Sequence, residues 1–240
     1  MTSSGKPLTA IEQKPTQKHT ATVFFMHGLG DSGAGWAPVT ENLAQYMPHV
    51  KFVLPNAPAR PVTLNFGMSM PAWYDIHSLA DMDQEEDDKG VLESLEKITK
   101  MIRDEMHHGI PSNRIVVGGF SQGSALALLT GMTFDYKLAG IIGLSGYLPL
   151  RTKISTMMSE ANRKTRIFMG HGDSDEVVQY KFATLSAQTL EKAGYPVTFK
   201  AYRGMGHSSS PDELRDMLTF LNEIIPNEPT ATATASSTSS

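Results

Sequence analysis

Cysteine is absent from the 240-residue sequence. Disulfides, cysteine-ligated zinc or iron–sulfur sites and a cysteine nucleophile are therefore excluded. No apolar run approaches the roughly 18 residues that a membrane-spanning helix needs, and the first twenty residues lack the apolar stretch of a secretion signal. The net charge of −4 shows no basic excess, so no nucleic-acid partner is expected. We expect a cytoplasmic protein that is small enough to enter the nucleus as well.

Both ends of the chain are poor in apolar residues. Residues 1–20 are polar and contain two prolines, and residues 227–240 are mostly threonine, alanine and serine. Such segments bury too little apolar surface to offset chain entropy, so we expect both to be disordered tails. No repeat and no linker interrupts the rest, which predicts one domain over residues 21–226.

The stretch between these ends alternates β-rich apolar runs with helical patterns. Strands are predicted at residues 21–26, 50–54, 114–118, 138–144, 165–170 and 196–202. Helices are predicted at residues 91–106, 122–132, 180–193 and 211–225. Strands that alternate with helices predict the α/β class, with a mainly parallel sheet and helices on both faces.

The strongest local signal is a G-x-S-x-G motif, Gly119-Phe120-Ser121-Gln122-Gly123, with an apolar strand before it and a small-residue helix after it. A nucleophilic serine needs this context, because a sharp strand-to-helix turn lifts its hydroxyl above the sheet. The glycines let the backbone turn without a Cβ clash. A plain glycine-flanked turn is the alternative, but the strand and helix favour Ser121 as a nucleophile.

A serine hydroxyl needs a base, and three of the eight histidines follow a predicted strand. His207 comes after the last strand and before the last helix, where the Ser, Asp, His chain order places the base. His27 and His171 each precede a glycine, and we interpret them as structural histidines that shape a loop. The acid should lie between serine and base. Asp173 and Asp175 both qualify, and the residues alone only slightly favour Asp175.

An oxyanion produced at Ser121 needs two N–H donors. One is expected from the backbone of Gln122, and the other from Leu29 in the glycine-rich loop after the first strand. A plain glycine-rich turn is the alternative for that loop. No metal-ligand spacing such as H-E-x-x-H occurs, and we expect neither a metal nor another cofactor.

Residues 22–226 resemble the acyl-protein thioesterases, also known as small cytosolic lysophospholipases. The likeness lies in F-M-H-G-L-G-D at residues 25–31, R-P-V-T-L-N at 60–65, M-P at 70–71 with Trp73 and Asp75, G-I-P-S-N-R-I at 109–115, G-G-F-S-Q-G at 118–123, H-G-D at 171–173 with Asp175, and H-S-S at 207–209 with Met205. The resemblance implies an α/β-hydrolase fold. It also implies a triad of Ser121, Asp175 and His207, with Leu29 and Gln122 as the oxyanion hole.

The same resemblance implies an enzyme that removes long fatty acyl groups such as palmitoyl from protein cysteines. G-protein α subunits are the expected substrates of fungal members, with weaker action on lysophospholipids and simple esters, and contact with the membrane is expected to be peripheral. Two positions depart from the family pattern: Glu176 stands where proline is usual, and Tyr147 where tryptophan is expected. The alternatives are a general carboxylesterase or lysophospholipase, and a catalytically inactive acyl-binding module.

The segment of residues 55–74 contains four prolines and shows neither a helical nor a strand period. Loops of this length in a compact domain are usually functional. Its apolar side chains are expected to line an acyl channel or to lie on a membrane surface. Residues that follow the predicted strand at 138–144 are expected to form another side of that channel. The alternative is a rigid connecting loop packed on the core. The expected lining residues are Leu64, Phe66, Met68, Met70, Trp73, Tyr147 and Leu148.

Overall fold

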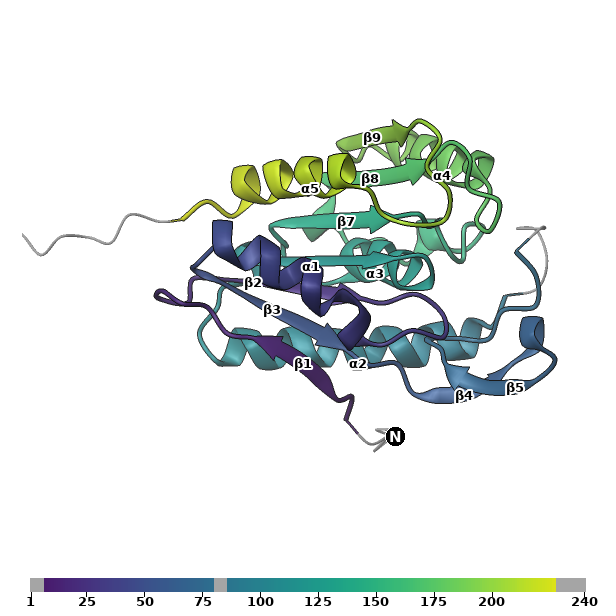
Figure 1. Ribbon diagram of the computed structural model, residues 1–240, viewed down its shortest axis with the longest axis horizontal. Helices are drawn as coiled ribbons and strands as arrows, with labels where there is room; N and C mark the ends of the chain where they lie inside the picture. Colours follow the sequence, from purple (N-terminus) through teal and green to yellow (C-terminus); the bar gives the residue numbers. More distant parts are fainter. Residues whose placement is uncertain (1–6, 80–85, 228–240) are drawn as a thin grey trace, which may run out of the picture.

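A computed structural model describes residues 7–79 and 86–227 of the chain. Its centre is a seven-stranded sheet that is parallel throughout except for its antiparallel first edge strand (Figure 1). In spatial order the strands are β1 (Ala10–Gln13), β3 (Val50–Pro55), β2 (Ala21–Met26), β6 (Ile115–Phe120), β7 (Gly140–Leu144), β8 (Ile167–Gly172) and β9 (Val197–Tyr202).

Helices cover both faces of the sheet, as predicted (Figure 1). One face packs against α1 (Gly33–Tyr46) and α5 (Pro211–Ile224). The other packs against α2 (Asp88–His107), α3 (Gln122–Thr133) and α4 (Tyr180–Lys192). Short 3₁₀ turns are η1 (Thr63–Asn65), η2 (Ser112–Arg114), η3 (Ile154–Thr156) and η4 (Glu160–Asn162).

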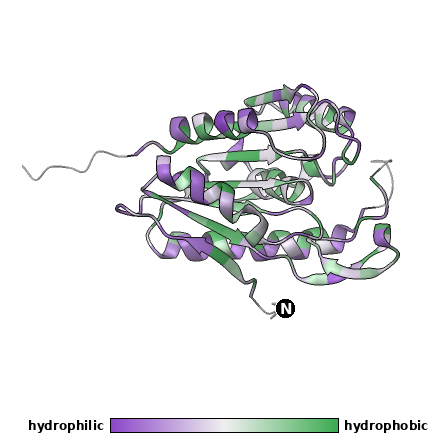
Figure 2. Ribbon diagram, viewed as in Figure 1, coloured by the Kyte–Doolittle hydropathy of each residue, from purple (hydrophilic) through white to green (hydrophobic). Residues whose placement is uncertain are grey.

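The central strands are buried on both faces, which explains their continuous apolar runs. Every residue of β2, β7 and β8 is buried, as expected of a parallel sheet covered by helices on both sides. Hydrophobic residues accordingly gather in the strands, whereas the outer helices mix both kinds (Figure 2). The edge strand β9 alternates between partly buried and exposed residues over most of its length.

One helix and three strands were missed from the sequence. The helix α1 has Gly33 and Gly35 in its first turn and Pro38 inside it, and these residues lower helix propensity enough to hide its pattern. The segment of residues 55–74, expected to lack strands, contains the antiparallel pair β4 (Ala59–Val62) and β5 (Met68–Pro71).

The remaining missed element is β1, and it corrects the expectation of a disordered tail over residues 1–20. This strand pairs with β3, with Ile11 opposite Leu54. Farther along, the backbone N–H groups of Thr16 and Gln17 both donate to the carbonyl of Pro48 at 2.9 Å. The described part of that segment, from residue 7, is therefore ordered on the edge of the sheet, because paired backbone groups replace the missing apolar surface. Residues 1–6 and 228–240 lie outside the described ranges.

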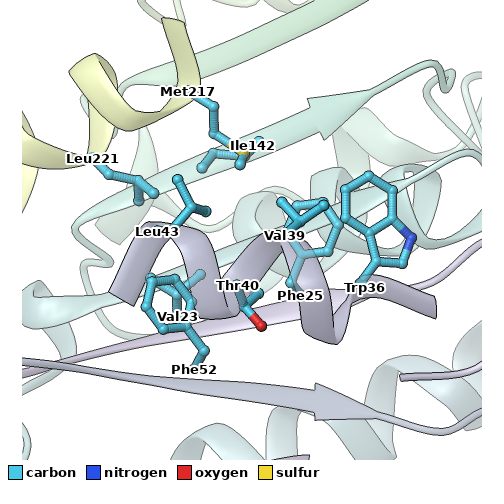
Figure 3. Close-up of a pocket in the computed structure, with 10 residues that line it drawn as sticks. All are labelled: Val23, Phe25, Trp36, Val39, Thr40, Leu43, Phe52, Ile142, Met217 and Leu221. Atoms are coloured by element: carbon cyan, nitrogen blue, oxygen red, sulfur yellow. The ribbon is translucent and has the colours of Figure 1, made fainter. Parts of the chain in front are cut away.

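A cavity of about 10 Å³ lies under α1, between that helix, α5 and the sheet (Figure 3). Its walls are apolar, because the hydroxyl of the lining residue Thr40 is turned to the carbonyl of Ala37, to which it donates at 3.1 Å. A space of this size is about that of one water molecule, and a water needs polar partners that these walls do not offer. The face under α1 is therefore slightly underpacked.

Candidate active site

Ser121 occupies a strained turn between β6 and α3. Its backbone has φ 54° and ψ −119°, a conformation that L-residues adopt at a cost of about 1–3 kcal/mol and that typically marks functional sites. Its N–H donates to the carbonyl of Leu144 at 2.8 Å. A Cβ on Gly119 would lie 2.3 Å from the carbonyl oxygen of Gly123, and one on Gly123 would lie 2.2 Å from that of Met26. The two glycines of the motif are thus required by space.

Three side chains from the carboxyl edge of the sheet form one hydrogen-bonded line. His207 Nε2 lies 2.9 Å from Ser121 Oγ, and His207 Nδ1 lies 2.8 Å from Asp175 Oδ2. A carboxylate only accepts, so Nδ1 carries the hydrogen and Nε2 is left to accept from the serine hydroxyl. This is the arrangement in which a histidine can take the proton of a nucleophile while a carboxylate orients it.

Asp175 is held ionised by its surroundings. Its side chain has no exposed surface. Burial by itself would raise the pKa of Asp175, but hydrogen bonds from His171, His207 and the backbone outweigh burial and hold that pKa well below its ordinary value. The backbone donors are the N–H groups of Val177 and Val178, each 2.9 Å from Oδ1. A buried anion is therefore available beside His207.

Asp173, the competing acid, points elsewhere. Its Oδ1 accepts from the N–H of Gly204 at 2.7 Å and from the hydroxyl of Ser174 at 3.0 Å. It is exposed to solvent and ties the loop after β8 to the turn after β9. The structure thus brings Asp175, and not Asp173, to the imidazole of His207.

The loop after β2 lies against the nucleophile. A Cβ on Gly28 would come 3.3 Å from the Cβ of Ser121. Among residues 7–79 and 86–227, no acceptor takes the N–H of Leu29. Gln122 is the first residue of α3, so its N–H has no partner inside the helix. Both candidate donors are therefore available near Ser121, and their role as an oxyanion hole stays a prediction.

His27 fixes the shape of this loop. Its Nδ1 donates to the carbonyl of Gly28 at 2.7 Å, and its Nε2 accepts from the N–H of Ala57 at 3.0 Å. The carbonyl of His27 accepts from the indole N–H of Trp73 at 2.8 Å. Burial lowers the pKa of His27, which agrees with a neutral ring that uses both nitrogens structurally.

The side chain of Gln122 is a contact that sequence reasoning missed. Its Oε1 accepts from the N–H of Trp73 at 2.9 Å, and its Nε2 donates to the carbonyl of Tyr74 at 2.7 Å. The amide therefore ties the turn at Ser121 to the segment after β5. The motif indicates only a backbone role for this residue, and no local pattern in the sequence points to the distant partners.

The residues expected to line an acyl channel do not form one surface. Leu64, Phe66 and Met68 lie exposed on the β4–β5 hairpin, at 39%, 94% and 56% of full exposure. Met70 is partly buried beside the loop after β2, since a Cβ on Gly30 would lie 3.7 Å from its sulfur. The expectation for Trp73 is wrong, because this residue is fully buried in the core.

Tyr147 and Leu148 are also buried in the core on the α3 side of the sheet. The hydroxyl of Tyr147 lies 2.9 Å from that of Tyr74, and burial raises the pKa of Tyr147 to about 12. The departure from tryptophan thus creates a buried phenol pair that links β7 to the segment after β5.

Comparisons with known proteins agree with the resemblance seen in the motifs. Residues 8–225 match the family described as Phospholipase/Carboxylesterase. Acyl-protein thioesterase 1 of Mycosarcoma maydis is 47% identical over 230 residues, which cover 90% of this chain and 96% of that protein. Acyl-protein thioesterase 1 of Yarrowia lipolytica is 44% identical over 223 residues, covering 91% and 98%.

Solved structures give the same result. The crystal structure of Zea mays acyl-protein thioesterase 2 superposes with a TM-score of 0.82 at 29% identity, covering 90% of this chain and 99% of that one. The crystal structure of Arabidopsis thaliana SOBER1 superposes with a TM-score of 0.82 at 30% identity, covering 86% and 99%. The predictions of an α/β-hydrolase fold and of a likeness to acyl-protein thioesterases are confirmed, and the chain belongs to the phospholipase/carboxylesterase family of α/β-hydrolases.

Proposed function

We propose that the protein is a serine hydrolase that removes long-chain fatty acyl groups, palmitoyl among them, from S-acylated cysteines of proteins. The observation that carries the proposal is the unbroken line from Ser121 Oγ through His207 to Asp175, with hydrogen-bond distances of 2.9 and 2.8 Å. The names of the similar thioesterases from M. maydis and Y. lipolytica support the choice of an acylated protein as substrate.

The reaction follows from the proton positions. His207 Nε2 takes the hydroxyl proton as Ser121 Oγ attacks the thioester carbonyl, and the N–H groups of Leu29 and Gln122 hold the oxyanion. The C–S bond breaks, and the cysteine thiol leaves with the proton from His207. A water molecule, deprotonated by the same imidazole, then attacks the acyl-serine and releases the fatty acid. Asp175 stays ionised throughout and stabilises the imidazolium.

Apolar residues on the β4–β5 hairpin support peripheral membrane contact. Phe66 is 94% exposed at its turn, with Leu64 and Met68 beside it. No described helix is long and apolar enough to cross a bilayer, and substrates with a palmitoylated cysteine lie at the membrane surface. The proposed partners are palmitoylated proteins, including G-protein α subunits, and lysophospholipids as weaker substrates. The place of action is proposed to be the cytoplasm.

Vesicle binding tests the membrane contact. Phe66→Ser should reduce co-sedimentation with phosphatidylcholine vesicles, because it removes an exposed apolar side chain. The matched control is Tyr46→Ser, which removes an exposed aromatic residue of α1, at 61% exposure. Equal binding of both variants and the wild type would contradict a role for the hairpin.

Turnover of a palmitoylated G-protein α subunit tests the activity. The wild type should release palmitate, and Ser121→Ala should release it slower by a factor on the order of 10⁴ or more. Equal turnover by both would refute the proposal. Matched acyl-thioester and acyl-ester substrates then separate a thioesterase from a general carboxylesterase or lysophospholipase by kcat/KM.

The matched family's description, phospholipase/carboxylesterase, is the reason to keep ester hydrolysis as the second candidate. The remaining alternative is an inactive acyl-binding module. Fluorophosphonate labelling of folded protein distinguishes it, because an activated Ser121 should be labelled and an inert one should not.

A further inference from the structure

Two imidazoles contact the carboxylate of Asp175. His207 Nδ1 approaches Oδ2 at 2.8 Å, and His171 Nε2 lies 3.3 Å from the same oxygen. His171 belongs to β8, four residues before Asp175, and its side chain is 1% exposed. The catalytic line described above does not use this second imidazole.

The hydrogen on His171 can be assigned from its partners. Nε2 lies 2.7 Å from the carbonyl oxygen of Val178, which can only accept, so Nε2 carries a hydrogen. Nδ1 is buried and has no hydrogen-bond partner in the described part of the chain. A second proton there would bury a charged donor without an acceptor, which is costly. His171 is therefore the neutral Nε2–H tautomer, which donates its one hydrogen to Val178 O while Nε2 also lies 3.3 Å from Asp175 Oδ2.

This geometry affects the charge that His207 meets. Oδ1 of Asp175 is occupied by two backbone N–H groups, and Oδ2 is shared by the two imidazoles. The positive end of an N–H dipole beside a carboxylate stabilises its negative charge and makes it a weaker base. An imidazolium at His207 is then stabilised less than it would be by a carboxylate without that donor.

We propose that His171 is a positioning residue, which holds Asp175 Oδ2 in line with His207 and withdraws part of its charge, so that His207 becomes a free base at a lower pH. The inference rests on the proposed function, in which His207 is the base. Other titratable groups face the cluster from the neighbouring helices: the ring of Tyr180 in α4 lies 6.1 Å from that of His171, and the carboxyl of Glu213 in α5 lies against Gly170.

Two substitutions separate this role from a purely structural one. His171→Phe keeps a ring of similar size and removes the donor, whereas His171→Gln keeps an N–H donor within reach of Asp175. The readout is kcat/KM for p-nitrophenyl butyrate between pH 5 and 9, with Ser121→Ala as the background. Thermal melting of each variant verifies that it is folded.

His171→Phe should move the acid limb of the profile upward by about 0.5–1 pH unit, since a 3.3 Å N–H contact should act less strongly than the roughly 1–2 pH units of a full hydrogen bond to a charged group. Its loss at pH 6 should be about two- to eightfold, the change in free-base fraction that such a shift causes, and clearly larger than its loss at pH 8.5. His171→Gln should retain the acid limb of the wild type. An equal loss at every pH in His171→Phe, or the same shift in both variants, would overturn the inference.

The wild type provides a measurement that needs no variant to fold. ¹⁵N-histidine NMR should find His171 as the Nε2–H tautomer from pH 6 to 9. A hydrogen on Nδ1, or a charged ring in that range, would overturn the inference while leaving the proposed function intact. Turnover that survives Ser121→Ala would instead overturn the proposed function, and the inference with it.

Discussion

The two ends of the parallel sheet each bring a hydroxyl, a histidine and a buried carboxylate together, with opposite chemical results. At the carboxyl end, Ser121 and Asp175 lie on opposite nitrogens of His207. At the amino end, Thr22 Oγ1 lies 2.8 Å from His19 Nε2 and donates to Glu105 Oε1 at 2.7 Å. The same three kinds of group are present, and only their order differs.

That order decides whether the hydroxyl can react. Thr22 gives its only hydrogen to Glu105, so His19 Nε2 must be the donor to the threonine oxygen and cannot act as its base. Lys51 adds a cation 2.9 Å from Glu105 Oε2. Burial alone would raise the pKa of Glu105, but hydrogen bonds from Lys51 and Thr22 outweigh it and lower that pKa. This cluster joins α2 to β2 and β3. Its role is structural and not catalytic.

The largest difference between the ends should appear in activity. Ser121→Ala should lower kcat by a factor on the order of 10⁴ or more, because it removes the nucleophile. Thr22→Val should change kcat less than about twofold, since Thr22 lies at the opposite end of β2 from the loop at Leu29. Both variants are measured by ester and thioester turnover. A large loss of kcat in Thr22→Val would contradict the distinction between a catalytic and a structural end of the sheet.

Substitution of Asp175 and of Glu105 sharpens the comparison between the two ends of the sheet. Asp175→Asn should lower kcat by roughly 10³–10⁴-fold, because an amide no longer enforces the tautomer of His207 or stabilises its cation. Glu105→Gln should leave kcat almost unchanged and lower the free energy of unfolding by about 1–3 kcal/mol, since Lys51 loses its charged partner. Steady-state kinetics and urea unfolding report the two effects, and the opposite pattern would contradict the assignment.

Stability should respond to pH in opposite directions through Glu105 and Glu213. Folding lowers the pKa of Glu105. The ionised Glu105 therefore adds to the free energy of unfolding above its ordinary pKa, and this contribution is lost as the pH falls. Glu213 is fully buried, and neither carboxyl oxygen has a hydrogen-bond partner of good geometry in the described residues. Burial raises the pKa of Glu213 to about 8, although the backbone of Ser210 favours the charged form.

The contribution of Glu213 is therefore complete below its ordinary pKa near 4.5 and is lost as the pH rises through about 8. Glu213→Gln should remove the loss that develops as the pH rises to about 8, which a shift of that size sets at up to about 5 kcal/mol, whereas Glu105→Gln should remove the acid loss. Urea unfolding of both variants between pH 4 and 9 measures the slopes. A wild-type slope that neither substitution changes would show that other groups control it.

The smallest change in stability is expected at the cavity under α1, which lies between the two ends of the sheet. Thr40→Val replaces the hydroxyl that bonds to Ala37 with a methyl group beside the apolar cavity of about 10 Å³ (Figure 3). It should raise the free energy of unfolding by less than about 1 kcal/mol, the usual value of one buried methylene, and leave kcat unchanged. A destabilised variant would mean that the hydroxyl bond to Ala37 matters more than the gap.

Physical reasons explain which elements the sequence predicts. The strands β2, β7 and β8 have no polar face and appear as apolar runs, and the turn at Ser121 needs glycines that leave a readable motif. In contrast, α1 is hidden by Gly33, Gly35 and Pro38, and β1 is too short to show a period. Its order comes from pairing with β3, which is distant in the chain.

The same limit applies to the site. Ser121 and His207 follow from a motif and from chain order, whereas the residues alone left Asp173 and Asp175 open. The contacts of Gln122 with Trp73 and Tyr74 cross 49 and 48 residues of sequence, and no local pattern encodes them. The contact of His171 with Asp175 depends on side-chain directions that only the folded loop sets.

The most direct test of the account is rapid-quench mass spectrometry of the wild-type protein during turnover of a palmitoyl thioester. A transient palmitoyl group is expected on the peptide that contains Ser121, absent in Ser121→Ala and longer-lived at low pH, where a protonated His207 cannot activate water. Hydrolysis of the thioester with no acyl group on that peptide, or with the group on another residue, would contradict it.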